Sequence, residues 1–402
     1  MLIKNPHNGH LYKTPHIMKT HFKATLLGIA LIGITACNAN NKKQSHQLAE
    51  AKTMTHNPSK QYIKVALLLD TSNSMDGLID QAKAQLWDIV NELSYAKCKN
   101  EKPNLQIALY EYGNDRLNGR EGYIRQVLAF SDDLDEISKE LFSLTTNGGE
   151  EYCGQVIQTS LNQLNWGKNA DDLKLIFIAG NEPFTQGNVN YKDASANAKE
   201  KDVTINTIFC GDYNQGVSTS WKDGAQLTNG NYIAINQNNK TIHIASPYDD
   251  DILILNQRLN KTYVIYGSQG RKKMALQAEQ DDNASGYSKA NAVSRTVSKS
   301  SHLYKNESWD LVDAEALNEV VISDLKDDAL PAELKGKSTE EIKKYISNKK
   351  KERNAIQEKI QELNEKRKVF ISKQKTESKN GLENALTKAI KEQAKKKKYS
   401  WE

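Results

Sequence analysis

The pattern of apolar and polar positions changes along the chain. Between residues 61 and 245, nearly continuous apolar runs alternate with segments whose apolar residues recur at helical spacing. The runs are typical of parallel strands buried on both faces, and the periodic segments are typical of helices that cover a sheet. This succession predicts an α/β fold with a Rossmann-like, doubly wound and mostly parallel sheet. Strands are expected at residues 63–69, 105–112, 123–130, 173–179, 203–209 and 232–235.

The regular alternation ends near residue 245. Residues 246–330 have a looser, mixed pattern, which we expect to pack on the domain as an extension. Residues 331–402 are predicted to form a charged helical tail, because a capping box precedes apolar residues at steps compatible with a heptad seam. The capping box is Ser338 with Glu341; the seam is Ile342, Ile346, Ile356, Ile360, Leu363 and Phe370, with Lys349, Arg353 and Arg367 between them. This coiled-coil-like helix could form a hairpin turning at Asn380-Gly381, lie alone on the surface, or oligomerise; its basic seam residues favour the first two.

Residues 1–37 have the pattern of a targeting segment. A basic stretch at 18–23 precedes the uncharged apolar stretch 24–34, which is too short to span a bilayer as a helix. The sequence Ile34-Thr35-Ala36-Cys37 resembles the lipobox of bacterial lipoproteins. That resemblance implies a signal peptide starting at Met18, a lipid-modified Cys37, and a flexible tether over residues 38–60. The alternative is an ordinary secretory signal in which Cys37 is incidental.

The net charge limits the kinds of partner that are expected, and the cysteine content limits the possible disulfides. The net charge of +5 over 402 residues is small and spread among nearly as many acids, so a nucleic-acid partner is not expected. Export implies an oxidising compartment, in which Cys98, Cys153 and Cys210 allow at most one internal bridge. We expect a disulfide between Cys153 and Cys210, which both fall at the ligand end of the sheet; two buried free thiols are the alternative.

The first buried strand leads directly into Asp70-Thr71-Ser72-Asn73-Ser74. Such a position is the carboxyl end of a central strand, where doubly wound sheets bind ligands. A carboxylate and two hydroxyls on one tight loop suit a hard divalent cation, so we predict a site for Mg²⁺, with Mn²⁺ or Ca²⁺ as alternatives. In the competing interpretation, Asp70 and the serines form a satisfied turn and helix cap without a metal.

Between a buried strand and an amphipathic helix, this Asp-x-Ser-x-Ser pattern resembles the metal-ion-dependent adhesion site of the von Willebrand factor type A (vWA) family. The resemblance covers approximately Tyr62 to Ile235. It implies that Ser72 and Ser74 bind the metal directly and that Asp70 binds it directly or through water. It also implies that an acidic group from a partner protein completes the coordination.

The chain departs from the family pattern at the other two metal loops. Glu150 falls on the position of the family's metal-binding Thr, with Thr145 and Thr146 as displaced alternatives. No Asp follows the strand at 173–179, so Asn181 or Glu182 would take its place. A carboxylate in place of a hydroxyl adds negative charge, which makes the cation less electrophilic toward a partner's acid.

The motifs of common enzyme classes are absent from the sequence, including a phosphate-binding loop and a Gly-x-Ser-x-Gly elbow. We therefore predict a non-enzymatic lipoprotein of the bacterial cell envelope, anchored by lipid in the outer membrane, whose domain binds a protein partner through a metal. The alternative is a structural envelope protein with a degenerate metal site and a helical interaction tail. A hydrolase, which would need turnover dependent on Glu150 or Glu182, is least favoured.

Overall fold

The computed structural model describes residues 60–239, 244–374 and 382–401, all within the unit His56–Glu402. The expected signal segment, Cys37 and nearly all of the expected tether lie outside the described residues, as does the Asn380-Gly381 turn. Within the described ranges, no helix combines the length and the apolar character needed to cross a bilayer.

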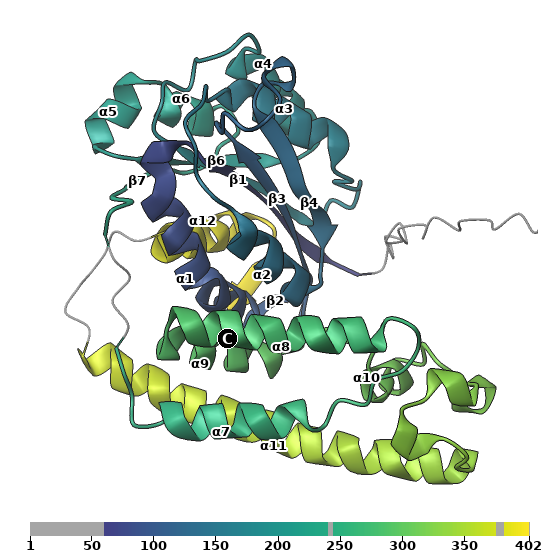
Figure 1. The fold of residues 1–402 in the computed structure, drawn as a ribbon. Coiled ribbons are helices and arrows are strands. Elements are labelled where there is room, and N and C mark those ends of the chain that lie inside the picture. Colours follow the sequence, from purple (N-terminus) through teal and green to yellow (C-terminus); the bar gives the residue numbers. More distant parts are fainter. Residues whose placement is uncertain (1–59, 240–243, 375–381, 402) are drawn as a thin grey trace, which may run out of the picture. The chain divides into compact units, whose positions relative to one another are not determined.

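A six-stranded sheet forms the centre of the fold, in the order β4-β3-β1-β5-β6-β7 (Figure 1). Its strands are β1 (Tyr62–Asp70), β3 (Asn104–Tyr112), β4 (Ile124–Ser131), β5 (Leu173–Gly180), β6 (Thr204–Cys210) and β7 (Tyr232–Ile235). Only β4 pairs antiparallel, at one edge; the other five strands are parallel. The predicted mostly parallel, doubly wound sheet is therefore confirmed.

Helices cover both faces of the sheet, which explains why its central strand is apolar throughout. Ile63 and Val65 of β1 belong to a core shared with α1, α2 and α12, whereas Ala66 and Leu68 belong to a second core shared with α3, α4 and α6. The helices are α1 (Asp76–Leu93), α2 (Leu134–Ser143), α3 (Cys153–Gln163), α4 (Tyr191–Glu200), α5 (Tyr213–Ser218), α6 (Trp221–Gln226) and α12 (Leu382–Lys396).

The helical extension packs on α1 and α2. Its α9 contacts α1, and its α8 contacts α2. The helices of this region are α7 (Asp249–Asn260), α8 (Gly270–Tyr287), α9 (Lys289–Lys299), α10 (Leu311–Ala316) and α11 (Thr339–Gln374). Short 3-10 segments are η1 (Asn73–Met75), η2 (Gly119–Glu121), η3 (Ile322–Asp324), η4 (Asp327–Ala329) and η5 (Ala332–Leu334).

The apolar seam of α11 is covered by this chain itself. Ile342 and Ile346 pack in a cluster with the α10 region, and Ile356 and Ile360 pack in the core that α7 and α9 share. The basic seam residue Arg353 is buried, where it binds Asp310. The expected hairpin of the tail is not formed, because α11 lies along α7 and α9 while α12 lies along α1, as Figure 1 shows.

Candidate metal site

The Asp70 carboxyl lies at the centre of the carboxyl edge of the sheet. β1 is flanked by β3 on one side and β5 on the other, so it marks the switch point at which doubly wound sheets bind ligands. Asp70 is fully buried at the end of β1. Its Oδ1 accepts a hydrogen bond from the Ser72 N–H at 2.7 Å, while no hydrogen-bond donor reaches its Oδ2.

The two serine hydroxyls lie together on the loop that follows Asp70. Ser72 Oγ and Ser74 Oγ are 3.2 Å apart, and the Asn181 amide donates to Ser74 Oγ at 3.2 Å from the end of β5. The Asn181 Oδ1 is buried without a hydrogen-bond partner, and a flip of the amide would exchange its two ends. The structure thus brings Asp70, Ser72, Ser74 and Asn181 to one place.

The acidic side chain that joins them is Glu151 rather than the expected Glu150. Glu151 is 3% exposed, and the carbon chain of its side chain lies against the same glycine as Asp70: a Cβ on Gly113 would lie 2.7 Å from Asp70 Oδ1 and 2.8 Å from Glu151 Cγ. Glu150 is exposed and accepts a hydrogen bond from Gln186 at 3.1 Å. The expected position was wrong because this segment has no helical or strand period that would fix which of two adjacent glutamates faces inward.

The displaced alternatives lie elsewhere or at the margin. Thr146 donates its hydroxyl to Asp76 at the start of α1. The Glu182 side chain is exposed, whereas its backbone N–H donates to Glu151 Oε2 at 3.4 Å. Glu182 therefore supports the inward position of Glu151 through its backbone.

The electrostatics of the Asp70–Glu151 pair favour a cation. Burial raises the pKa of Asp70 well above its usual range, and the nearby charge of Glu151 and a hydrogen bond to it add to the rise. Burial also raises the pKa of Glu151. Two adjacent buried carboxyls cannot both ionise without a positive charge, and among the described residues no Lys or Arg forms an ion pair with either. A divalent cation would supply that charge.

The donor chemistry fits a hard cation. The site offers carboxylate, hydroxyl and amide oxygens, which Mg²⁺ and Ca²⁺ prefer, and no thiolate or imidazole of the kind zinc prefers. Across the described part of the chain, no three His, Cys, Asp or Glu side chains form a group that could hold a metal. The candidate site therefore depends on its serine hydroxyls as much as on its two carboxylates.

The expected disulfide between Cys153 and Cys210 is not formed. Both are buried free thiols, and they belong to different apolar cores on opposite faces of the sheet. Cys153 Sγ instead lies 3.9 Å from the Tyr112 hydroxyl. Shared position at one end of the sheet was thus insufficient to predict a bridge, because the face on which each thiol packs also matters.

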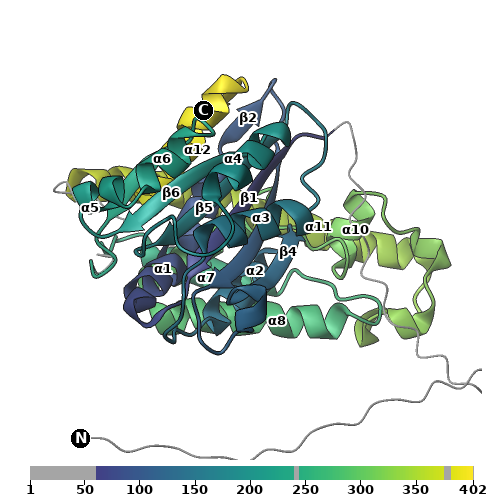
Figure 2. The same cartoon turned by 90° about the horizontal axis from the view of Figure 1, so that it is seen from above.

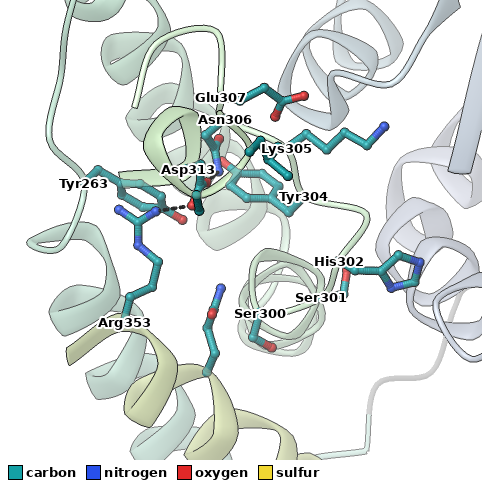
Figure 3. Close-up of a pocket in the computed structure, with 13 residues that line it drawn as sticks. Tyr263, Ser300, Ser301, His302, Tyr304, Lys305, Asn306, Glu307, Asp313 and Arg353 are labelled. Carbon is teal, nitrogen blue, oxygen red and sulfur yellow. Dashed lines mark hydrogen bonds and ion pairs between the residues drawn. The ribbon is translucent and has the colours of Figure 1, made fainter. Parts of the chain in front are cut away.

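A separate polar cavity of about 270 Å³ lies between α9, α10 and α11 (Figure 3). Its two cationic side chains from Lys305 and Arg353 already have acidic partners within the chain. Arg353 reaches Asp313 and stacks 4.5 Å from the Tyr263 ring centre, while Lys305 extends out to pair with Asp132 at 2.7 Å. Because these two cations are neutralised internally, the cavity is a weaker candidate for a binding site than the Asp70 loop.

Part of the chain matches a known protein family. Residues 64–242 match the family model described as the von Willebrand factor type A domain, so this part of the chain is a vWA domain. No curated protein matches the sequence.

Several solved structures are similar to part of this chain at low sequence identity and low TM-score. BatB from Bacteroides thetaiotaomicron is 14% identical, with a TM-score of 0.33 over 43% of this chain and 90% of that one. An aerotolerance-related membrane protein from Bacteroides fragilis is 15% identical, with a TM-score of 0.31 over 44% and 93%. Proximal thread matrix protein 1 from the mussel byssus, with a zinc-occupied MIDAS motif, is 14% identical, with a TM-score of 0.33 over 44% and 42%.

Proposed function

We propose that the vWA domain is a metal-dependent protein-binding module on a membrane-anchored lipoprotein of the bacterial envelope. The observation that carries the proposal is the buried Asp70–Glu151 pair, whose Asp70 Oδ2 has no donor and which lies beside the Ser72 hydroxyl. The proposal includes no catalytic step.

The residues that would hold the cation are Asp70, Ser72, Ser74 and Glu151, with Asn181 at the margin. A bound Mg²⁺, or Mn²⁺ or Ca²⁺ in its place, would supply a positive centre for an oxygen of the partner. Ser74 is exposed, so the loop is reachable from solvent on that side. Two carboxylates balance the charge of a divalent ion, so an acidic partner group would gain less here than at a site with one carboxylate.

Calorimetric titration of the full chain with Mg²⁺, Mn²⁺ and Ca²⁺ tests the metal site. We expect a binding heat that Asp70→Ala abolishes, because it removes the central carboxylate of the site. Glu151→Gln should lower the metal affinity by at least about tenfold, because it removes the second negative charge. Glu150→Gln is the matched control, one residue away and exposed, and it should leave the affinity unchanged. No heat with any of the three ions would refute the metal site.

A structural role with a degenerate metal site is the second candidate. It is favoured by the hydrogen bonds from Ser72 N–H to Asp70 and from Asn181 to Ser74, which satisfy part of the loop without a metal. Under this alternative, self-assembly through α11 would matter instead. Val369 is 54% exposed on that helix, so Val369→Glu would lower the sedimenting mass while Ser72→Ala would not.

The lipid anchor is proposed from the lipobox at Cys37. Growth with labelled palmitate should label the wild-type chain in the membrane fraction, and Cys37→Ser should remove the label because the acyl acceptor is lost. Fractionation of the two membranes then tests the outer-membrane location. Labelling that persists in Cys37→Ser would contradict the anchor at this residue.

A further inference from the structure

The loops that enter four of the five parallel strands each carry an exposed lysine. Lys60 precedes β1, Lys102 precedes β3, Lys168 precedes β5 and Lys201 precedes β6. Because parallel strands begin at the same side of a sheet, these four lysines lie along one edge, opposite the edge that holds Asp70.

The C-terminal end of the chain adds to this edge. β8 (Tyr399–Trp401) pairs antiparallel with β2 (Ala96–Cys98), and both lie near the chain's C-terminal end in Figure 2. The Tyr399 hydroxyl donates to the backbone carbonyl of Asp171, just before β5. Lys398, the exposed residue before β8, therefore belongs to the same edge. We call Lys60, Lys102, Lys168, Lys201 and Lys398 the basic edge.

The acidic residues nearby leave this charge in excess. Asp171 pairs with Lys99 at 2.6 Å and Asp202 pairs with Lys397 at 2.5 Å, so other lysines already neutralise them. The buried Asp172 accepts the Tyr62 N–H at 3.0 Å, and its charge offsets part of that of the buried Lys64 and Lys174. Among the described residues of these loops, the exposed acids that remain, Glu101 and Glu200, are fewer than the lysines of the basic edge.

A hollow of about 900 Å³ opens on this edge, with Lys168 and Lys201 in its lining. Beneath it lie two buried lysines, which donate to backbone carbonyls: Lys64 to Asn165 at 2.9 Å and Lys174 to Gly167 at 3.0 Å. These are two positive charges against the one nearby buried carboxylate of Asp172, so they add to the charge of the exposed lysines.

The opposite edge has the reverse sign. Asp115 follows β3, Glu182 follows β5 and Asp212 follows β6, and all three are exposed. Among the described residues, none of them pairs with a Lys or Arg. The domain is therefore polarised along its strands, positive where the strands begin and negative around the candidate metal site.

We propose that the basic edge binds the surface of an anionic lipid bilayer. Charge complementarity favours such a surface, and the residues that precede Lys60, where the lipid-modified Cys37 is expected, join the domain at this edge. A bilayer at the basic edge leaves the metal site on the side facing away, open to a partner. This orientation rests on the proposed lipid anchor. Lipid binding by the basic edge itself is therefore tested on the Cys37→Ser chain, which carries no lipid that would bind the vesicles.

The test is co-sedimentation of the full Cys37→Ser chain with vesicles of phosphatidylcholine alone or with phosphatidylglycerol. Binding to the neutral vesicles measures the background from the apolar segment 24–34. The test variant carries Lys168→Gln, Lys201→Gln and Lys398→Gln. The matched control carries Lys326→Gln, Lys335→Gln and Lys337→Gln, three exposed lysines between η3 and α11 that bear the same total charge.

We expect the parent chain to prefer the anionic vesicles and the test variant to lose about a hundredfold in its partition onto them, at about 1 kcal/mol for each lysine near the surface. The control should stay within about threefold of the parent, since its lysines do not face the lipid. Salt at about 1 M should abolish the preference by screening.

Two results would overturn the proposal: no preference of the parent for anionic vesicles, or equal losses in the test and control variants. Circular dichroism and the Mg²⁺ titration of the same variants report on folding and on the metal site. If vesicle binding contradicts the basic edge while the Mg²⁺ titration is normal, the proposed metal-binding function is unaffected. If the chain binds no Mg²⁺ but prefers anionic vesicles through the basic edge, the lipid-binding proposal is unaffected.

Discussion

Replacing Asp281 with Asn should loosen the helical extension from the vWA domain. The Asp281 carboxylate, 14% exposed, accepts hydrogen bonds from Arg295 Nε at 2.6 Å and Lys299 Nζ at 2.9 Å, and both cations are buried in α9. Arg295 also reaches Asp135 of α2 at 2.8 Å. This buried network thus joins α8 and α9 to a helix of the vWA domain.

The magnitude follows from the charges left behind. Although burial alone would raise it, the neighbouring Lys299 and Arg295 hold the pKa of Asp281 well below its usual range, so the carboxylate is ionised. Asp281→Asn keeps the size of the side chain but, among the described residues, leaves buried Arg295 paired with Asp135 alone and buried Lys299 without an ion pair. Removing one partner of a buried ion pair costs about 3–5 kcal/mol, which we expect here.

A double-mutant cycle separates charge from packing. In the Asp281→Asn background, Lys299→Met removes one of the uncompensated cations and should restore about 2 kcal/mol or more. Urea unfolding followed by circular dichroism gives the free energies, and hydrogen exchange shows whether α8 and α9 open first. The control is Asp282→Asn, an adjacent exposed acid. A loss below about 1 kcal/mol in Asp281→Asn, or strictly additive losses, would refute the reasoning.

Three further predictions concern the site and its surroundings. Gly113→Ala should cost about 1–3 kcal/mol and weaken Mg²⁺ binding, because Gly113 has φ +78° and lies against Asp70; Gly286→Ala, which has open space at its Cβ, should cost nothing measurable in urea unfolding. Burial raises the pKa of the Cys153 and Cys210 thiols well above their usual range, so a thiol reagent should label neither until urea unfolds the chain; rapid labelling of the native chain would contradict their burial. Burial, with help from the Lys102 charge, lowers the pKa of His302 from 6.5 to about 4, so the unfolded chain takes up a proton first as the pH falls through this window. The unfolding free energy should therefore fall on acidification, and His302→Asn should remove that part of the fall; an unchanged pH profile in the variant would count against it.

The sheet could be predicted because its strands are buried on both faces, which requires apolar residues at consecutive positions. β1 and β5 carry this signal most clearly, with Leu67 to Leu69 and Leu175 to Ile178. The pairing of β2 with β8 could not be predicted, because strands of three residues are too short to show a period. Its partners are also distant in sequence, since Ala96 pairs with Trp401.

The candidate site was predictable where its residues are close in sequence. Asp70, Ser72 and Ser74 share one loop, and the preceding strand fixes where that loop lies. Glu151 was missed because its inward position depends on contacts with Gly113 and with the Glu182 backbone, which are distant in sequence. The burial of Arg353 could not be predicted for the same reason, since its partner Asp310 lies 43 residues away.

The position of α12 has a consequence for how the protein is made. Leu386, Ala389 and Ile390 of this helix complete the same core as α1 and β1, although the family match ends at residue 242. A fragment excised at the limits of that match would lack one wall of its own interior. During synthesis, that face of the sheet likewise stays uncovered until α12 has left the ribosome, so the apolar core of the domain closes late.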